Sequence, residues 1–184
     1  MTFTDHTIES APPAARRSME AVSKKLGYLP SAVGRLANSP QLLESFLRTN
    51  ALFEATTLSP LAREVLVMTM ATRNGCHLCV AMHSAALTAL GADPDLIAAL
   101  RESRPLADAP LEAMRRFVLE ALATSGAVSA EAMEDFLGHG YTRQNALEVV
   151  LGIGVYTLST LANRMTDAPL DERLEPFAWT GHAA

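Results

Sequence analysis

Two cysteines and a histidine occur at a spacing that suits redox chemistry. The 184-residue chain has only two cysteines, Cys76 and Cys79, and His83 follows the second by one helical turn. Because a helix turns by about 100° per residue, these three residues fall within about 60° of one another on one helix face. That face would present two thiols beside an imidazole able to accept or return a proton near neutral pH.

The residues in front of this group predict a helix start. Asn74-Gly75 indicates a turn, and either residue can cap the helix that follows. Both cysteines would then lie in the first helical turn, where free N–H groups and the helix dipole favour negative charge. This environment lowers a thiol pKa from about 8.5 toward neutrality, and Cys76, nearer the helix start, would be the more acidic thiol.

Two other interpretations of the cysteine pair are available. Cys76 and Cys79 could be two buried small apolar residues. With His83 they could also be three zinc ligands, but a structural zinc site normally needs four, usually from two separated pairs. The sequence has no second cysteine pair, and no spacing completes a cage with the other histidines, which are His6, His77, His139 and His182. Redox chemistry without a bound metal is therefore the favoured interpretation.

Composition excludes several broad classes of protein. Asp and Glu number 20 against 15 Lys and Arg, so the formal charge is −5 and a compact basic nucleic-acid module is excluded. The apolar fraction of 49% supports a real core, which excludes a wholly disordered chain. Two cysteines do not make a secreted disulfide scaffold. The length predicts one domain over residues 1–184.

No targeting or membrane-spanning segment is expected. The first thirty residues are interrupted by charges and contain no apolar stretch of signal-peptide type. The most apolar run, residues 146–162, contains Glu148 and is shorter than the roughly 20 residues that a bilayer span needs, which favours a buried helix. The expected compartment is the cytoplasm, where a close cysteine pair stays reducible.

The chain as a whole predicts an all-α fold, since strand patterns are nearly absent and Ala, Leu, Met and Glu dominate. Caps, prolines and apolar spacing predict helices over about 13–26, 31–37, from 40 past 53, 60–72, 76–90, 94–102, 110–124, 129–138 and 142–165. A break at 167–169 leaves a tail through Trp179 that is expected to pack against a neighbour.

One order of residues resembles a known family. Glu64, eleven intervening residues, and then Cys76-x-x-Cys79-x-x-x-His83 is similar to the peroxidase-related branch of the alkylhydroperoxidase D-like, or carboxymuconolactone decarboxylase, superfamily. The flanking segments 71–76 and 83–91 strengthen the resemblance, which covers a catalytic core of about 52–102. It implies an AhpD-like helical bundle, a homo-oligomer (trimer or hexamer) and a thiol-dependent peroxidase, an antioxidant oxidoreductase.

The resemblance also implies roles for four residues. Cys79 is the thiol that attacks a hydroperoxide and becomes a sulfenic acid, which reverses the order that the helix start alone suggests. Cys76 then closes the redox-active disulfide. His83 and Glu64 form the proton relay that deprotonates the attacking thiol. An external dithiol, lipoyl or thioredoxin-like, would restore the pair, and no metal, haem or flavin is required.

The sequence departs from the family pattern just before Cys79. Leu78 stands where alkylhydroperoxidase D proper has a histidine, and a histidine appears instead at His77, a weak candidate for substrate contact. Tyr156, Asn163 and Trp179 could line a pocket, but a place in the core or at an interface is favoured for each. Glu64 could be a surface charge that favours its helix dipole.

Two other functions remain open. One is a non-catalytic redox-sensing or ligand-binding helical oligomer. The other is a superfamily lyase such as a carboxymuconolactone decarboxylase-like enzyme, in which the cysteines are incidental, although the true decarboxylase branch lacks this cysteine pair.

Overall fold

A computed structural model describes residues 3–181, which fold into α-helices and one 3-10 helix with no strand among them. The predicted all-α class is confirmed. The helices are α1 Pro13–Leu26, α2 Ser31–Leu36, α3 Pro40–Glu54, α4 Pro60–Arg73, α5 His77–Ala89, α6 Pro94–Arg101, α7 Ala109–Ala123, α8 Ala130–Gly138 and α9 Arg143–Met165, followed by the 3-10 helix η1 Glu172–Phe177.

Side-chain caps explain why most of these helices begin where they do. The oxygens of Ser39, Ser59, Asp93, Asp108 and Ser129 each accept a backbone N–H from the first turn of the helix that follows. Proline occupies an early position in several of the same helices, where its missing N–H costs nothing. The predicted boundaries lie close to the observed ones because these signals are local.

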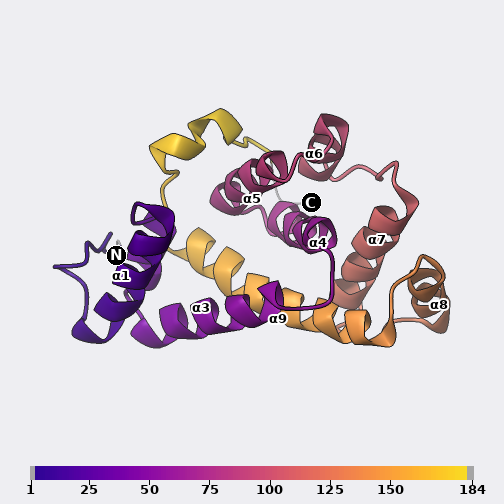
Figure 1. Cartoon of the computed structure of the whole chain (residues 1–184), viewed down its shortest axis with the longest axis horizontal. Coiled ribbons are helices and arrows are strands. Elements are labelled where there is room, and N and C mark those ends of the chain that lie inside the picture. The colour runs from indigo at the N-terminus through magenta and orange to yellow at the C-terminus, as the bar shows by residue number, and fades with distance from the viewer. Residues whose placement is uncertain (1–2, 182–184) are drawn as a thin grey trace.

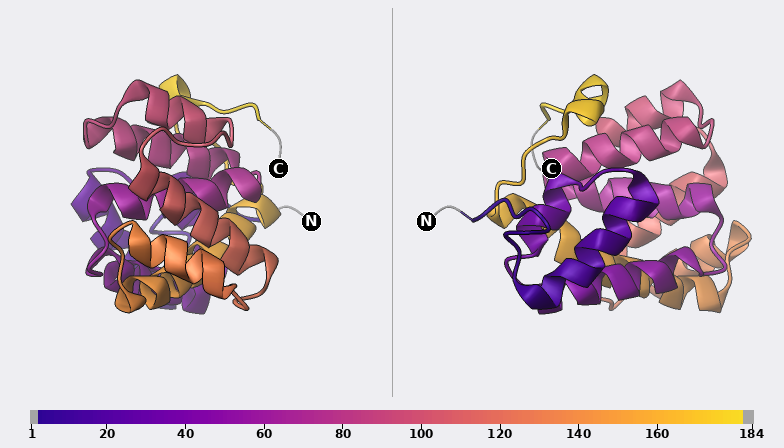
Figure 2. Two further views of the ribbon diagram at one scale, coloured as in Figure 1. Left: turned by 90° about the vertical axis from the view of Figure 1, so that its right-hand side faces the viewer. Right: turned by 60° about the vertical axis from the view of Figure 1, so that its left-hand side comes forward.

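Helix α4 is the centre of the bundle. Its residues 65–72 are all buried, and it packs against α5, α6, α7 and α9. Figure 1 shows α4 and α5 lying together above the long α9, with α3 alongside α9 at the lower edge. The turned views in Figure 2 show α1 crossing α3 at the N-terminal end of the bundle.

Helix α9 is buried along one side only. Its most apolar 18-residue window has a mean hydropathy of 1.4, so length and composition alone would let it span a membrane, but half of that window is buried inside the protein. Close packing on the buried side depends on Gly152, because a Cβ there would lie 2.6 Å from the Phe53 ring and 2.8 Å from a Leu66 methyl. The predicted buried helix is therefore present, with an exposed apolar side in addition.

The tail after α9 packs against α5 and α6 of the same chain. Arg101 of α6 donates hydrogen bonds to the backbone oxygens of Phe177 and Ala178 at 3.0 and 2.8 Å, and to Ser84 of α5 at 2.9 Å. Trp179 returns a hydrogen bond from its indole nitrogen to the Arg101 oxygen at 3.1 Å. These contacts hold η1 against α5.

Candidate redox site

The turn between α4 and α5 positions the cysteine pair. Gly75 has a φ of 62°, in the left-handed region that glycine adopts without strain. Asn74 ties the turn to α9, since its side-chain nitrogen donates to the Thr160 hydroxyl at 2.8 Å. The start of α5 is thereby fixed against two other helices.

The residue that caps α5 is Cys76 itself. Its sulfur accepts the backbone N–H of Cys79 at 3.3 Å, so the prediction that Asn74 or Gly75 would cap this helix is wrong. A sulfur is a weak acceptor, and it takes this position because Gly75 has already turned the backbone toward the helix. Cys79 lies in the first turn of α5, as predicted.

Cys76 and Cys79 form a disulfide. Their Cα atoms are 5.3 Å apart, a separation typical of disulfides. The two residues are only 1% and 2% exposed, and both belong to the main hydrophobic core. The two cysteines are thus joined covalently and almost completely shielded from solvent.

His83 and Glu64 lie together beside the pair. Nδ1 of His83, on α5, is 2.8 Å from Oε2 of Glu64, on α4. Their side chains are 15% and 14% exposed, so Glu64 is not a free surface charge. Because α4 and α5 pack along their lengths, a carboxylate on one helix orients an imidazole on the other.

A cavity of about 270 Å³ borders Cys79 and His83. Helix α9 contributes the polar residues Tyr156, Ser159 and Asn163 to its wall. The rest of the wall comes from Met82 of α5 and from α1, α2 and α3; it is mostly apolar but includes Lys25, Asn50 and Glu54. The cavity therefore places a mostly apolar wall next to Cys79 and His83.

Asn163 and Tyr156 belong to the site, although the sequence favoured a core or interface position for them over a place in a pocket wall. Both are 4% exposed, as expected for core residues, but both border the cavity. Nδ2 of Asn163 donates to the Cys79 sulfur at 3.4 Å, while its buried Oδ1 has no hydrogen-bond partner. The Tyr156 ring meets the His83 ring edge-on, with centroids 5.3 Å apart.

Burial and charge keep the Tyr156 phenol neutral. Burial raises the pKa of Tyr156 above its ordinary value, and the negative charges of Glu64 and Glu54 raise it further. Its hydroxyl donates to Asn50 at 3.2 Å. Tyr156 therefore shapes and orients the site and does not act as a titrating acid near neutral pH.

His77 does not border the cavity at Cys79. It is exposed, and its Nδ1 is hydrogen-bonded to the Trp179 backbone oxygen at 2.8 Å, with the two rings 5.3 Å apart. Trp179 thus neighbours the helix that holds the cysteines without touching the cavity. Leu78, in place of the family histidine, is buried.

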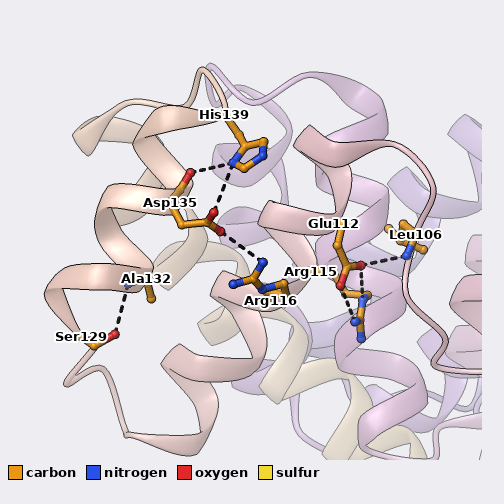
Figure 3. A network of polar contacts seen from close by, with 8 residues as sticks. All are labelled: Leu106, Glu112, Arg115, Arg116, Ser129, Ala132, Asp135 and His139. Carbon is orange, nitrogen blue, oxygen red and sulfur yellow. Dashed lines mark hydrogen bonds and ion pairs between the residues drawn. The ribbon is translucent and has the colours of Figure 1, made fainter.

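The other histidines lie apart from the cysteines. Figure 3 shows His139 at the end of α8 with Asp135, to whose backbone oxygen its Nδ1 lies at 2.8 Å. Arg116 of α7 is 3.6 Å from the same Asp135 side chain, so these contacts join α7 to α8. His6 contacts Ser10 near the N-terminus, and His182 lies outside the described residues. Within residues 3–181 no three His, Cys, Asp or Glu side chains gather as a metal site would require.

A family model matches the segment that holds the candidate redox site. The carboxymuconolactone decarboxylase family model matches residues 40–121, the segment that holds α4, α5 and the Glu64, Cys76, Cys79 and His83 group. The match covers less than half of the chain, so it shows that this segment is similar to the carboxymuconolactone decarboxylase, AhpD-like, family, a resemblance that the spacing of these residues predicts. None of the curated proteins compared with the chain is a significant match.

Solved structures show the same fold. An alkylhydroperoxidase AhpD core, peroxidase-related protein from Ralstonia eutropha JMP134 superposes with a TM-score of 0.82 at 20% identity, over 94% of this chain and 93% of that one. A peroxidase-related protein from Silicibacter sp. TM1040 gives a TM-score of 0.77 at 22% identity, with the same coverage of both chains. The debrominase Bmp8, solved with 2,3,4-tribromopyrrole, gives 0.71 at 14% identity over 90% of this chain and 89% of that one. The chain therefore has the AhpD-like fold.

Proposed function

We propose that the protein is a thiol-dependent peroxidase that reduces hydroperoxides through the Cys76–Cys79 pair. The observation that carries the proposal is Cys79 at the wall of a cavity, one helical turn from an imidazole held by Glu64. This arrangement supplies a nucleophile, a second thiol within bonding reach and a proton relay. The peroxidase-related neighbours of the same fold support the same chemistry.

The first step is attack by the Cys79 thiolate on the hydroperoxide. A new S–O bond forms as the O–O bond breaks, so sulfur is oxidised and the hydroperoxide is reduced to an alcohol or to water. The departing oxygen needs a proton, which His83 can deliver from the position that Glu64 fixes. The Asn163 amide, which already donates to the Cys79 sulfur, stabilises the thiolate before attack.

The second step closes the disulfide. The Cys76 sulfur attacks the sulfenic sulfur of Cys79, and the hydroxyl group leaves as water after taking up a proton. The 5.3 Å separation of the two Cα atoms allows this without movement of the helix backbone. An external dithiol, such as dihydrolipoamide or a thioredoxin-like protein, then restores both thiols by exchange.

Peroxide consumption with a dithiol reductant tests the proposal. Wild type should consume tert-butyl hydroperoxide with dihydrolipoamide as reductant, and Cys79→Ser should lose this turnover. In Cys76→Ser, mass spectrometry after one equivalent of peroxide should find a sulfenic acid on Cys79, because the resolving thiol is missing. Full turnover in Cys79→Ser would overturn the proposal.

Two further outcomes of the same experiment favour other functions. Disulfide formation with turnover at the uncatalysed background would indicate a redox sensor. If the protein catalyses another reaction and still does so after both thiols are alkylated, the result would indicate a lyase in which the cysteines are incidental.

A further inference from the structure

The disulfide lies between two separate hollows. Cys79 borders the largely apolar cavity of about 270 Å³ described above, and Cys76 borders a second hollow of about 290 Å³. Each cysteine lines one of the two and not the other. Among the described residues, Asn163 alone lines both, so its side chain stands at the partition between them.

The walls of the two hollows differ in chemistry. The hollow at Cys76 has buried Gly75 and Leu78 beside the sulfur, while His77, Arg164 and Asp167 at its rim are exposed. The cavity at Cys79 is walled mainly by apolar side chains of α1, α2 and α3. A largely polar hollow thus borders Cys76, and a mostly apolar cavity borders Cys79.

Burial makes these hollows the routes to the sulfurs. Cys76 and Cys79 are only 1% and 2% exposed, so a reagent cannot reach either residue directly from the open surface. Thiol–disulfide exchange also has a direction, because the attacking thiolate approaches in line with the S–S bond, opposite the sulfur that leaves. We therefore expect a thiolate that attacks Cys76 to enter through the hollow that Cys76 lines, and a reagent that attacks Cys79 to enter through the cavity that Cys79 lines.

The groups around Cys79 suit it to be the sulfur that leaves. Each sulfur accepts one hydrogen bond at the start of α5, Cys76 from the Cys79 N–H at 3.3 Å and Cys79 from Asn163 Nδ2 at 3.4 Å. Only Cys79, however, shares a cavity with His83. His83 follows one turn later and can receive or return a proton. A sulfur that is stabilised as a thiolate leaves faster in exchange.

We propose that the two half-reactions use opposite sides of the disulfide: hydroperoxide reaches Cys79 through the apolar cavity, and the reducing thiolate attacks Cys76 through the hollow rimmed by His77, Arg164 and Asp167. The inference rests on the proposed function and adds the site at which the reductant acts. A reductant whose reactive dithiol projects on a narrow arm fits such an opening, because its bulk can stay outside the rim.

The exchange balances as follows. The reductant thiolate forms a new S–S bond to Cys76 as the Cys76–Cys79 bond breaks, and the electron pair leaves on Cys79 as a thiolate. The second thiol of the reductant then attacks the reductant's sulfur in this mixed disulfide. This attack releases the Cys76 thiolate and leaves the reductant as a cyclic disulfide. The reductant loses two electrons and two protons in total, and the protein gains two thiols.

Locating the mixed disulfide tests the direction of attack directly. The protein is oxidised with diamide, not peroxide, so that the test is independent of peroxidase activity. It is then treated briefly with glutathione, a monothiol, and quenched with acid, and the free thiol is alkylated before peptide mass spectrometry. Glutathione should be found on Cys76 with the alkyl group on Cys79, and the reverse pattern would overturn the proposal.

A matched pair of blocking variants tests the two routes. Ala168→Trp fills the hollow at Cys76, and Leu47→Trp fills the cavity at Cys79. Because exchange rates depend on access to the attacked sulfur, Ala168→Trp should slow reduction of the diamide-oxidised protein by dihydrolipoamide about tenfold or more. The rate at which tert-butyl hydroperoxide oxidises reduced Ala168→Trp should stay within about twofold of wild type. Leu47→Trp should slow this oxidation about tenfold or more and leave the rate of reduction within about twofold of wild type.

Each variant also controls for folding of the other, since each must retain one half-reaction at the wild-type rate. Where either variant fails to fold, as judged by circular dichroism, the smaller changes Ala168→Leu and Leu47→Phe replace it. The two-sided arrangement would be overturned if the Leu47 variant slowed reduction and the Ala168 variant did not. It would also be overturned if either folded variant slowed oxidation and reduction equally. If hydroperoxide does not oxidise wild type at all, the proposed function fails, whereas the diamide measurements still decide where the reductant attacks.

Discussion

Nδ1 of His83 lies 2.8 Å from Oε2 of Glu64, although the two residues are on different helices. The contact fixes which ring nitrogen of His83 faces the carboxylate, and so leaves the other nitrogen for proton transfer in the site. Both side chains are mostly buried, so water does not compete strongly for this hydrogen bond. The pair has the geometry of a base held in place by an acid residue.

Glu64→Gln tests this pair. An amide keeps the shape of the side chain but does not stabilise a protonated imidazole, so we expect oxidation of reduced protein by hydroperoxide to slow about tenfold or more. The measurement is the rate of thiol loss followed by quenched alkylation. Glu134→Gln, at an exposed position on α8, is the matched control and should leave the rate unchanged. Equal rates in wild type and Glu64→Gln would remove Glu64 from the mechanism.

Asn163→Leu tests the hydrogen bond to the Cys79 sulfur. Loss of this donor should raise the pKa of the Cys79 thiol, since a hydrogen bond stabilises a thiolate more than a thiol. Leucine is similar in size and removes a buried oxygen that has no partner, so we expect the fold to tolerate the change.

The thiolate can be titrated by its ultraviolet absorbance in a Cys76→Ser background, where only Cys79 contributes. Ser159→Ala, on the same wall of the cavity, controls for a general loss of polarity and should produce a smaller shift. An unchanged Cys79 pKa in Asn163→Leu would show that the amide does not act on the sulfur.

The sequence predicted the parts of the site that lie within one local stretch. The cap at Ser59, the turn at Gly75 and the spacing of Cys76, Cys79 and His83 are local signals, and the helices form as they indicate. The sulfur cap at Cys76 was missed because cysteine is a weak acceptor that capping preferences do not favour.

Contacts from α9 could not be predicted in the same way. Tyr156 and Asn163 reach the site only because α9 packs across α4 and α5, and a single sequence does not specify that packing. One signal was available. Tyr156, Ser159 and Asn163 are spaced by three and four residues, which places a polar stripe on the buried side of an apolar helix. Buried polar groups require partners, so such a stripe marks a candidate site.

Gly152→Ala should destabilise the fold. The added Cβ would lie 2.6 Å from the Phe53 ring and 2.8 Å from Leu66, and both side chains are completely buried and cannot move aside freely. Overpacking of this kind costs about 1–3 kcal/mol, reduced by about 1 kcal/mol because alanine favours helix. Urea unfolding measures the difference. Gly138→Ala, where a Cβ meets nothing within 4 Å, should be neutral or stabilising, and the same result at Gly152 would contradict the close approach.

Glu148 makes stability depend on pH. Burial raises its pKa, but hydrogen bonds from the Thr57 backbone, the Asn145 and Thr57 side chains and Gln144 outweigh burial and hold the pKa below its usual 4.5. A carboxyl group whose pKa is depressed by folding stabilises the native state above its unfolded pKa. That contribution is lost as the pH falls through the lower, folded value.

We therefore expect wild type to lose stability in acid more steeply than Glu148→Gln, whose side chain does not titrate. Thermal unfolding between neutral pH and about pH 3 measures the two slopes. Glu20→Gln, at an exposed position on α1, is the control and should follow wild type. Parallel curves for wild type and Glu148→Gln would show that the hydrogen bonds to Glu148 do not change its ionisation.

We propose that the exposed side of α9 joins copies of the chain. Leu147, Val150, Leu161 and Met165 are 73%, 57%, 50% and 73% exposed. At about 100° per residue they fall within about 60° of one another and form one apolar stripe along the helix. An apolar stripe of this kind on a protein surface is typical of an interface, and the gain from covering it is about 25 cal/mol per Å².

Light scattering at micromolar concentration tests the interface. Wild type should have a mass that is a multiple of 19.7 kDa, and the double variant Leu147→Glu/Met165→Glu should shift toward the single-chain mass, because its carboxylates would have to be buried without partners. Leu90→Glu, at a residue that is 50% exposed outside the stripe, introduces one such charge elsewhere and should keep the wild-type mass. A monomeric wild type, or a stripe variant that retains the full oligomer mass, would rule out this side of α9 as the interface.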